Sequence, residues 1–230
     1  MEMNFLNVHQ IYFHESQLPR LEYIPYYNKN CTIFFENSVI RDLIESGKHK
    51  DSEYFGVVSY QLREKNVITK DSWRNNKNIA NISVKEFTPE LFESELLYHK
   101  PDIMSFQRHS PHDPVTVADQ FHPNFSRYFK EIMNKIGYDW KPTNFEDIIY
   151  CNSFVAKSEI YERYAKEMLA PAMDIMKEMP ELSGNAGYSK ELPDNLKKEF
   201  GINYYPYHPF LIERFFSYFA WMNNLNVLHF

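Results

Sequence analysis

Tyr150, Cys151, Asn152 and Ser153 form a polar patch inside an apolar run that extends over residues 148–156. The run has the length and composition of a buried strand. Amide and hydroxyl groups in such a strand cost free energy unless they find hydrogen-bond partners. We therefore expect a central strand with Asn152 open to the main cleft, where Tyr150, Asn152 and Ser153 could bind a polar ligand.

Glu213 and Arg214 lie within an otherwise aromatic and aliphatic helix predicted at residues 208–222. Buried charges are normally paired or functional. Neighbouring residues project about 100° apart around a helix, so we expect Glu213 to need a substrate, or the patch at 150–153, as its partner. Glu213 could be a general base and Arg214 could hold a phosphate; the alternative is a structural ion pair. His208 lies at the helix start, where anions are favoured.

Arg108, His109, His112 and Asp113 form a third group, on a loop that follows a short strand predicted at residues 102–106. Two imidazoles and a carboxylate could hold Mn²⁺ or Mg²⁺, the first more readily. Arg108 and the histidines could instead meet a diphosphate directly. The prolines in the segment are also typical of an ordinary surface loop. His229 could reach back to such a metal or lie in a frayed tail at residues 226–230.

The patch at 148–158, the long helix after it and the Glu213-Arg214-Phe215-Phe216 segment resemble the C-terminal half of the bacterial DUF4422-type glycosyltransferases. That family combines an aromatic-Cys-Asn segment, a long helix and a Glu-Arg-Leu/Phe-Phe helix. A weaker similarity covers residues 34–37 and 54–60. Where the family continues with His-Tyr-Arg-Arg, this chain has Ser59-Tyr60-Gln61-Leu62-Arg63, so Tyr60 and Arg63 are the matching residues. The similarity is specific over roughly the last third of the chain.

The resemblance implies a glycosyltransferase of the GT-A type that moves a sugar from a nucleoside diphosphate sugar to a glycan or polysaccharide acceptor. It implies sugar contacts by Asn152 and Ser153, and it matches Asp102 to a strand where the family has an aspartate. Such a transfer needs a neutralised diphosphate and a positioned, deprotonated acceptor hydroxyl. Metal-dependent members of this broad class usually carry Asp-x-Asp after a strand, and this sequence contains none.

The order of predicted elements favours an α/β fold with a mostly parallel, Rossmann-like sheet flanked by helices. Strands are predicted at 5–13, 54–60, 102–106 and 148–156, and helices at 33–46, 88–100, 122–135, from 158 onward and at 208–222. Ligands of such sheets bind beyond the carboxyl ends of the strands, here residues 14–17, 60–63 and 105–113. We expect one domain over residues 1–230, with a mobile insertion at 181–205.

Two helix boundaries carry local signals. Thr88 and Pro89 predict an N-cap and first turn. Ser158 is predicted to cap the long helix after the patch, and Pro171 to kink or split that helix.

Bulk composition narrows the function classes. The net charge of −6 gives no basic field for a polyphosphate backbone, so nucleic acid is not an expected partner. Two cysteines in 230 residues exclude a disulfide scaffold and fit a cytoplasmic setting. No apolar run has the length of a membrane span or the form of a signal peptide.

Two other function classes stay open at this stage. The first is a non-catalytic carbohydrate- or protein-binding module that has a GT-A-like fold, which the missing Asp-x-Asp favours. The second is a metal-dependent hydrolase centred on His109, His112 and Asp113.

Overall fold

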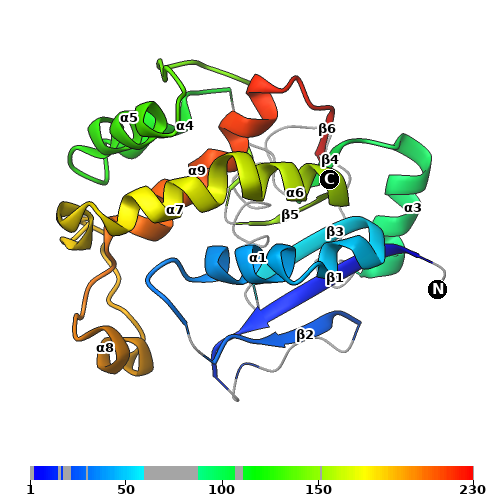
Figure 1. The fold of residues 1–230 in the computed structure, drawn as a ribbon, viewed down its shortest axis with the longest axis horizontal. Helices are drawn as coiled ribbons and strands as arrows, with labels where there is room; N and C mark the ends of the chain where they lie inside the picture. Colours follow the sequence, from blue (N-terminus) through cyan, green and yellow to red (C-terminus); the bar gives the residue numbers. More distant parts are fainter. Residues whose placement is uncertain are drawn as a thin grey trace, which may run out of the picture.

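The computed structural model describes residues 3–14, 17, 22–29, 31–59, 88–106, 111–150 and 152–229. In this part of the chain a six-stranded sheet carries helices on both faces (Figure 1). The strands are β1 (Asn4–Tyr12), β2 (Ile24–Tyr27), β3 (Ser52–Ser59), β4 (Ile103–Ser105), β5 (Phe154–Lys157) and β6 (Val227–His229). The helices are α1 (Glu36–Glu45), α3 (Pro89–His99), α4 (Pro114–Ala118), α5 (Phe125–Lys135), α6 (Ser158–Tyr164), α7 (Ala170–Lys177), α8 (Asp194–Phe200) and α9 (Tyr207–Met222), with short 3₁₀ turns η1 (Lys48–Asp51) and η4 (Pro180–Ser183).

The sheet is mixed, with the strand order β2-β1-β3-β5-β4-β6. β1 pairs in parallel with β2 and β3, and β4 with β6, but β5 runs antiparallel to both β3 and β4. The expectation of a mostly parallel sheet was therefore wrong, while the α/β class is confirmed. β5 begins at the edge of the sheet where β4 ends, with Phe154 opposite Ser105, so the two strands run in opposite directions.

β5 is central, as expected, but shorter than the predicted strand. Only Phe154–Lys157 pairs with β3 and β4, and Phe154, Val155 and Ala156 are buried. Asn152 adopts a positive φ of 50°, which ends the extended conformation before β5. Tyr150, Asn152 and Ser153 therefore lie ahead of the strand, in a turn that the bond from the Ser153 amide to the Tyr150 carbonyl closes, and are not part of it.

Two apolar layers sandwich the sheet. The larger one joins α1, α5, α9 and the α6–α7 helix, and α1 lies beside that helix (Figure 1). The smaller one packs Phe92 and Leu96 of α3 against Leu6, Val8 and Tyr54 on the other face. Helix α9 is buried on most of its circumference, as expected for a helix in the middle of a core.

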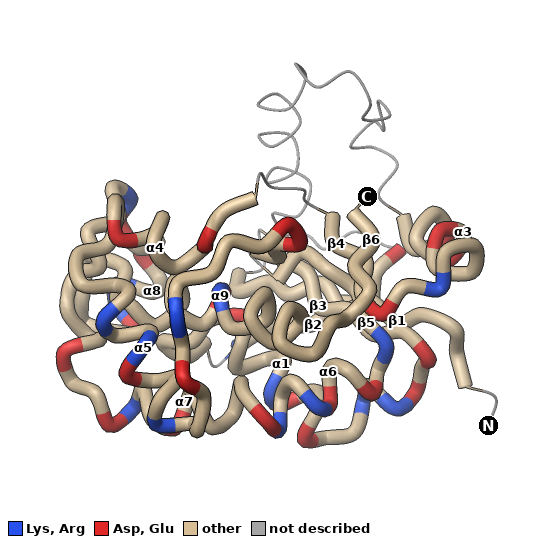
Figure 2. The backbone as a smooth tube through the Cα atoms, turned by 90° about the horizontal axis from the view of Figure 1, so that it is seen from above, with Lys and Arg blue, Asp and Glu red and all other residues tan. Residues whose placement is uncertain are grey.

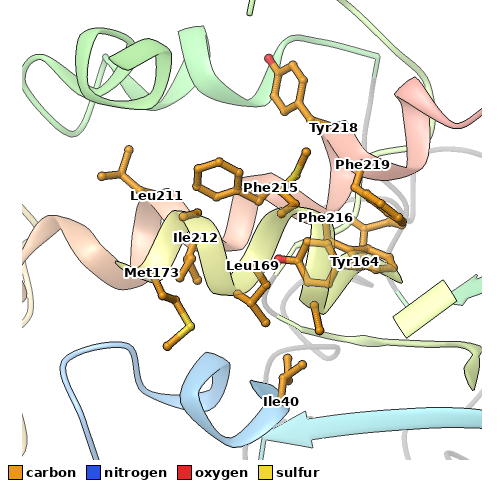
Figure 3. Packing of buried hydrophobic residues seen from close by; sticks show 14 of the residues in the cluster. Ile40, Tyr164, Leu169, Met173, Leu211, Ile212, Phe215, Phe216, Tyr218 and Phe219 are labelled. Carbon is orange, nitrogen blue, oxygen red and sulfur yellow. The ribbon is translucent and has the colours of Figure 1, made fainter. Parts of the chain in front are cut away.

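Aromatic and aliphatic side chains of α9 meet the α6–α7 helix directly. Figure 3 shows Ile212 and Phe216 of α9 toward Tyr164, Leu169 and Met173, with Ile40 of α1 nearby, whereas Leu211 and Phe215 point to the other side of α9. Phe216 stacks on Phe154 of β5 at a centroid distance of 3.9 Å. This contact fixes the position of α9 over the central strand.

The predicted N-cap at Thr88 is confirmed, because its side chain accepts a hydrogen bond from the Leu91 amide, and Pro89 opens α3. The predicted cap at Ser158 was wrong: the Ser158 hydroxyl donates to the Ser52 carbonyl at 2.6 Å, tying α6 to β3. Near Pro171 the helix continues from α6 to α7 through a π-helical turn, Ala165–Leu169. A widened turn accommodates a residue that has no N–H donor.

The two edge strands were not predicted as strands. β2 contains Pro25, which is tolerated at an edge because its missing N–H need not face a neighbour. β6 lies in the segment predicted as a tail, and its three residues are held by parallel pairing with β4. Short segments of this kind depend on a partner strand rather than on their own pattern.

The insertion predicted at 181–205 contains η4 and α8 and is held by isolated bridges between Asn185 and Pro206 and between Glu191 and Tyr204. Leu192 and Leu196 pack with Phe35 in a small apolar cluster. The expected mobility of the insertion stays a prediction.

Charges of both signs alternate along the outer helices α1, α6 and α7 (Figure 2). Arg41 pairs with Glu45 and Asp174, and Lys166 pairs with Glu162. Within the described ranges, no helix is both long enough and apolar enough to cross a membrane.

The close approach of β3 and β5 generates a prediction about Gly56. A Cβ at this position would lie 2.8 Å from Cγ2 of the buried Val155, and a valine side chain has little freedom to move away. Gly56→Ala should lower the free energy of unfolding by about 1–3 kcal/mol in urea titrations. Gly56→Ala combined with Val155→Ala should cost less than the sum of the single changes. Additive losses would show that the two residues are not in contact.

Candidate functional site

The edge of the sheet where β1, β2, β3, β4 and β6 end, and where β5 begins, gathers most of the described site residues. Asn152 and Ser153 lie directly before β5 and Tyr150 just ahead of them. His229 ends β6, opposite Ser105 of β4. Open α/β sheets bind ligands at this edge, beyond the carboxyl ends of their parallel strands.

Side-chain contacts join three segments at this edge. Nε2 of His229 lies 2.9 Å from Oδ1 of Asp147, so the end of β6 meets the segment that leads to Tyr150. Nε2 of His112 lies 3.0 Å from the Tyr150 hydroxyl. The Arg214 guanidinium lies over the Tyr150 ring, with Cζ 4.9 Å from the centroid. The structure thus brings Tyr150, His112 and Arg214 together.

Helix α9 positions these groups through two hydroxyls. The Ser217 hydroxyl accepts from the Ile149 amide and donates to the Ile149 carbonyl, both at 2.8 Å. The Tyr218 hydroxyl donates to Oδ2 of Asp113. One helix therefore fixes both the segment that carries Tyr150 and the turn that carries His112.

Asp113 has a structural role. Its Oδ1 accepts from the amides of Val115 and Thr116 and caps α4, while Oδ2 accepts from the Thr143 amide and from Tyr218. With only 3% of the residue exposed, its carboxylate oxygens are occupied by donors. Asp113 does not fit the predicted metal or diphosphate role.

In the part of the chain that the structure describes, no three His, Cys, Asp or Glu side chains converge as metal ligands. Arg108 and His109 of the same group lie outside the described residues, as do Tyr60 and Arg63. Their predicted roles remain predictions.

Glu213 and Arg214 form an ion pair, with Arg214 Nη1 3.1 Å from Oε2 of Glu213. The two long side chains meet although neighbouring residues project about 100° apart, and the expected further partner of Glu213, a substrate or the patch at 150–153, stays a prediction. Nη1 also donates to the Phe210 carbonyl at 2.9 Å, and the guanidinium lies 5.4 Å from the Phe125 centroid. The buried Nε has no hydrogen-bond partner in the described structure.

Asn152 and Ser153 are largely buried, at 8% and 2% exposure. The Ser153 carbonyl accepts from the Phe106 amide at 2.9 Å, and its amide donates to the Tyr150 carbonyl at 3.1 Å. The left-handed backbone of Asn152 is one that asparagine tolerates better than most residues. A ligand role for their side chains stays a prediction.

Two predicted residues lie elsewhere. Asp102 precedes β4 at the opposite edge of the sheet, where it pairs with Lys157 at 2.8 Å and accepts from the Asn226 amide. His208 is 3% exposed and packs against Phe34. Burial lowers the pKa of His208 to about 4, so its imidazole is neutral near pH 7, and its predicted role beside an anion stays a prediction.

Ser217, Tyr218, Asp147 and the ordered position of His229 were not predicted. Ser217 follows Glu213 by four residues and Tyr218 follows Arg214 by four, a spacing that places each pair on one face of a helix and is the sequence signal that would include them. Their partners lie far away in the sequence and could be known only from the fold.

Scans against protein-family models, curated proteins and solved structures found no match to this chain.

The buried histidines predict how stability depends on pH. Burial lowers the pKa of His208, and burial with the charge of Lys48 lowers that of His9, to about 4 in each case. In the unfolded chain both titrate near 6.5. Protons therefore bind the unfolded state first as the pH falls. The free energy of unfolding should be highest above pH 6.5 and should decrease toward pH 4, by up to ~1.4 kcal/mol per pH unit for each histidine.

Urea titrations between pH 7 and 4.5 measure this slope. His208→Leu should reduce it, whereas His99→Gln, at an exposed position of α3, serves as a control and should not. An unchanged slope in His208→Leu would contradict the prediction. Glu162 is the same in all the proteins compared, so it does not change the difference between slopes; hydrogen bonds from Lys166 and His49 lower its pKa from 4.5 to about 2, and its contribution decreases mainly below pH 4.5.

Proposed function

We propose that this chain is a glycosyltransferase with a GT-A-like fold, which transfers a sugar from a nucleoside diphosphate sugar to a glycan or polysaccharide acceptor. The proposal rests on the resemblance of the Tyr150 and Glu213 segments to DUF4422-type transferases. The observation that carries it is the meeting of those two segments in space, where Arg214 lies over the Tyr150 ring.

Arg214 supports the diphosphate part of the proposal. Its guanidinium is held between two aromatic rings, its side chain is 14% exposed, and its Nε has no hydrogen-bond partner in the described structure. A fixed, planar guanidinium suits phosphate oxygens because it can donate two parallel hydrogen bonds. His112, next to Tyr150, supplies a second nitrogen near the same place.

Glu213 is the described carboxylate beside Arg214, and in the proposed reaction it takes the acceptor proton. The acceptor oxygen forms a bond to the anomeric carbon of the donor sugar. The bond from that carbon to the diphosphate oxygen breaks, and its electron pair leaves with the nucleoside diphosphate. The hydroxyl proton passes to Glu213, while Arg214 offsets the charge that develops on the diphosphate.

The arrangement of Asp113 favours this proposal over a metal-dependent hydrolase. A hydrolase centred on His109, His112 and Asp113 would need free oxygens on Asp113, and those oxygens accept four protein donors. No step of the proposed reaction therefore passes through a metal held by Asp113.

Nucleotide binding gives the first test. Sugar conjugates of UDP, GDP, CMP and dTDP, each with and without Mn²⁺, are screened by thermal shift. One nucleotide class should raise the melting temperature, because a ligand that binds only the folded state at 100 times its Kd adds about 2.7 kcal/mol. Arg214→Lys should lose most of this shift. Arg163→Lys is the matched control, because Arg163 also lies over a ring, at 5.6 Å from Phe219 on α9.

Absence of any nucleotide-dependent shift in the wild-type chain would count against a transferase and leave a binding module. A shift that persists without Mn²⁺ and in EDTA would show that donor binding does not require a metal.

Glu213 gives the second test. Glu213→Gln retains the shape of the side chain and removes its charge. Turnover should fall by ~10²–10⁴-fold, the usual contribution of general acid–base catalysis, with little change in melting temperature. Glu45→Gln is a control, because Glu45 is an exposed glutamate that also pairs with an arginine, Arg41, on α1. A large loss of melting temperature, with turnover per folded molecule unchanged, would assign Glu213 a structural role.

A further inference from the structure

Three aromatic rings gather beside the start of α9, next to the Glu213–Arg214 pair. Tyr188 lies 5.1 Å from Phe210 and 5.4 Å from Tyr205, and Tyr205 lies 6.0 Å from Phe210, measured between ring centroids. The planes meet at 54–89°, so none of these contacts is parallel stacking. Tyr188 is 39% exposed and Phe210 and Tyr205 are half-buried. We call these three rings the aromatic platform.

Backbone contacts hold the platform in place. The Ala186 amide donates to the Tyr205 carbonyl at 3.0 Å, and the Ala186 carbonyl lies 2.7 Å from Nδ1 of His122. The His122 ring stacks on Phe210 with centroids 4.4 Å apart. Burial lowers the pKa of His122, so the neutral ring donates from Nδ1. The segment that carries Tyr188 is thus fixed before any ligand arrives, which reduces the entropy lost on binding.

The platform is continuous with the proposed catalytic site. The Phe210 carbonyl accepts a hydrogen bond from Arg214, one helical turn away, and Phe210, Glu213 and Arg214 are the half-buried residues of this stretch of α9. A molecule that lies on the platform therefore reaches toward Glu213 and Arg214 over about 5 Å, the rise of one turn.

We propose that the aromatic platform binds a pyranose ring of the acceptor glycan. This inference rests on the proposed function, which requires an acceptor next to Glu213. A pyranose has an apolar face of C–H groups that packs on aromatic rings, and hydroxyls at its rim that can hydrogen-bond to the phenols of Tyr188 and Tyr205. Three partly exposed rings match one or two sugar units. A stable protein–protein interface, by contrast, takes about 20–30 residues from each partner.

Glycan binding is measured first without nucleotide, by saturation-transfer NMR and calorimetry on the full chain. The probes are maltohexaose, cellohexaose, chitohexaose and mannohexaose. One class should bind the wild-type chain. Tyr188→Ala should weaken that binding about tenfold, the scale of one aromatic contact, and Tyr188→Phe should retain most of it. Tyr98→Ala is the matched control, because Tyr98 is an exposed tyrosine (82%) on α3.

Each outcome decides between the two proposals. If no probe binds the wild-type chain, or if Tyr188→Ala binds as the wild type does, the platform is not an acceptor site, whatever the nucleotide screen shows. If a glycan binds through Tyr188 but no nucleotide stabilises the chain, the platform stands and the transferase proposal fails. If sedimentation velocity shows a dimer that Tyr188→Ala abolishes, the platform is a contact between two copies and the inference is overturned. Phe210→Leu, which keeps an apolar side chain, repeats the test at a second ring.

Discussion

The burial of α9 is the constraint on which the rest of the structure depends. Its aromatic face stacks on β5 through Phe216 and Phe154 and fills the space beneath the α6–α7 helix. Nε of Arg214 aside, the polar groups of a helix enclosed on most sides need partners, because an unpaired buried group costs a few kcal/mol. Ser217 and Tyr218 therefore reach backbone and carboxylate partners on segments that are remote in sequence. The same contacts place Tyr150 and His112 beside Arg214.

Three acidic residues of this chain show how the surroundings decide the role of a carboxylate. Asp113 is surrounded by donors and serves as a cap. Asp102 lies just before β4, where it pairs with Lys157 of β5 and accepts a hydrogen bond from the Asn226 amide just before β6. Glu213 pairs with Arg214 and keeps 21% of its side chain exposed, so solvent and ligands can reach it. From residue type alone, all three could belong to one candidate site. The packing of the chain leaves only Glu213 there.

Much of the architecture could be predicted from the sequence because the signals are local. The spacing of Val39, Ile40, Leu43 and Ile44 gives α1, the Thr88–Pro89 pair starts α3, and the positive φ of Gly47 follows the end of α1. The direction of β5 and the pairing of β6 could not be predicted, because they depend on where the chain turns between distant segments. For the site, Tyr150, Glu213 and Arg214 were found from charge and polarity within apolar runs. The capping role of Asp113 was missed because two of its donors come from Thr143 and Tyr218.

The reversed β5 also has a consequence for how this protein is made. β5 pairs with a strand that precedes it by about a hundred residues, and the helix that covers it comes later still. During synthesis, β3 leaves the ribosome long before its neighbour β5 exists, so the edge of β3 stays open to other chains. Pairing with another nascent chain is the hazard of such an edge. The slow step of folding should then be the docking of β5 and α9 together, and chaperones that shield strand edges should raise the yield more than those that act on helices.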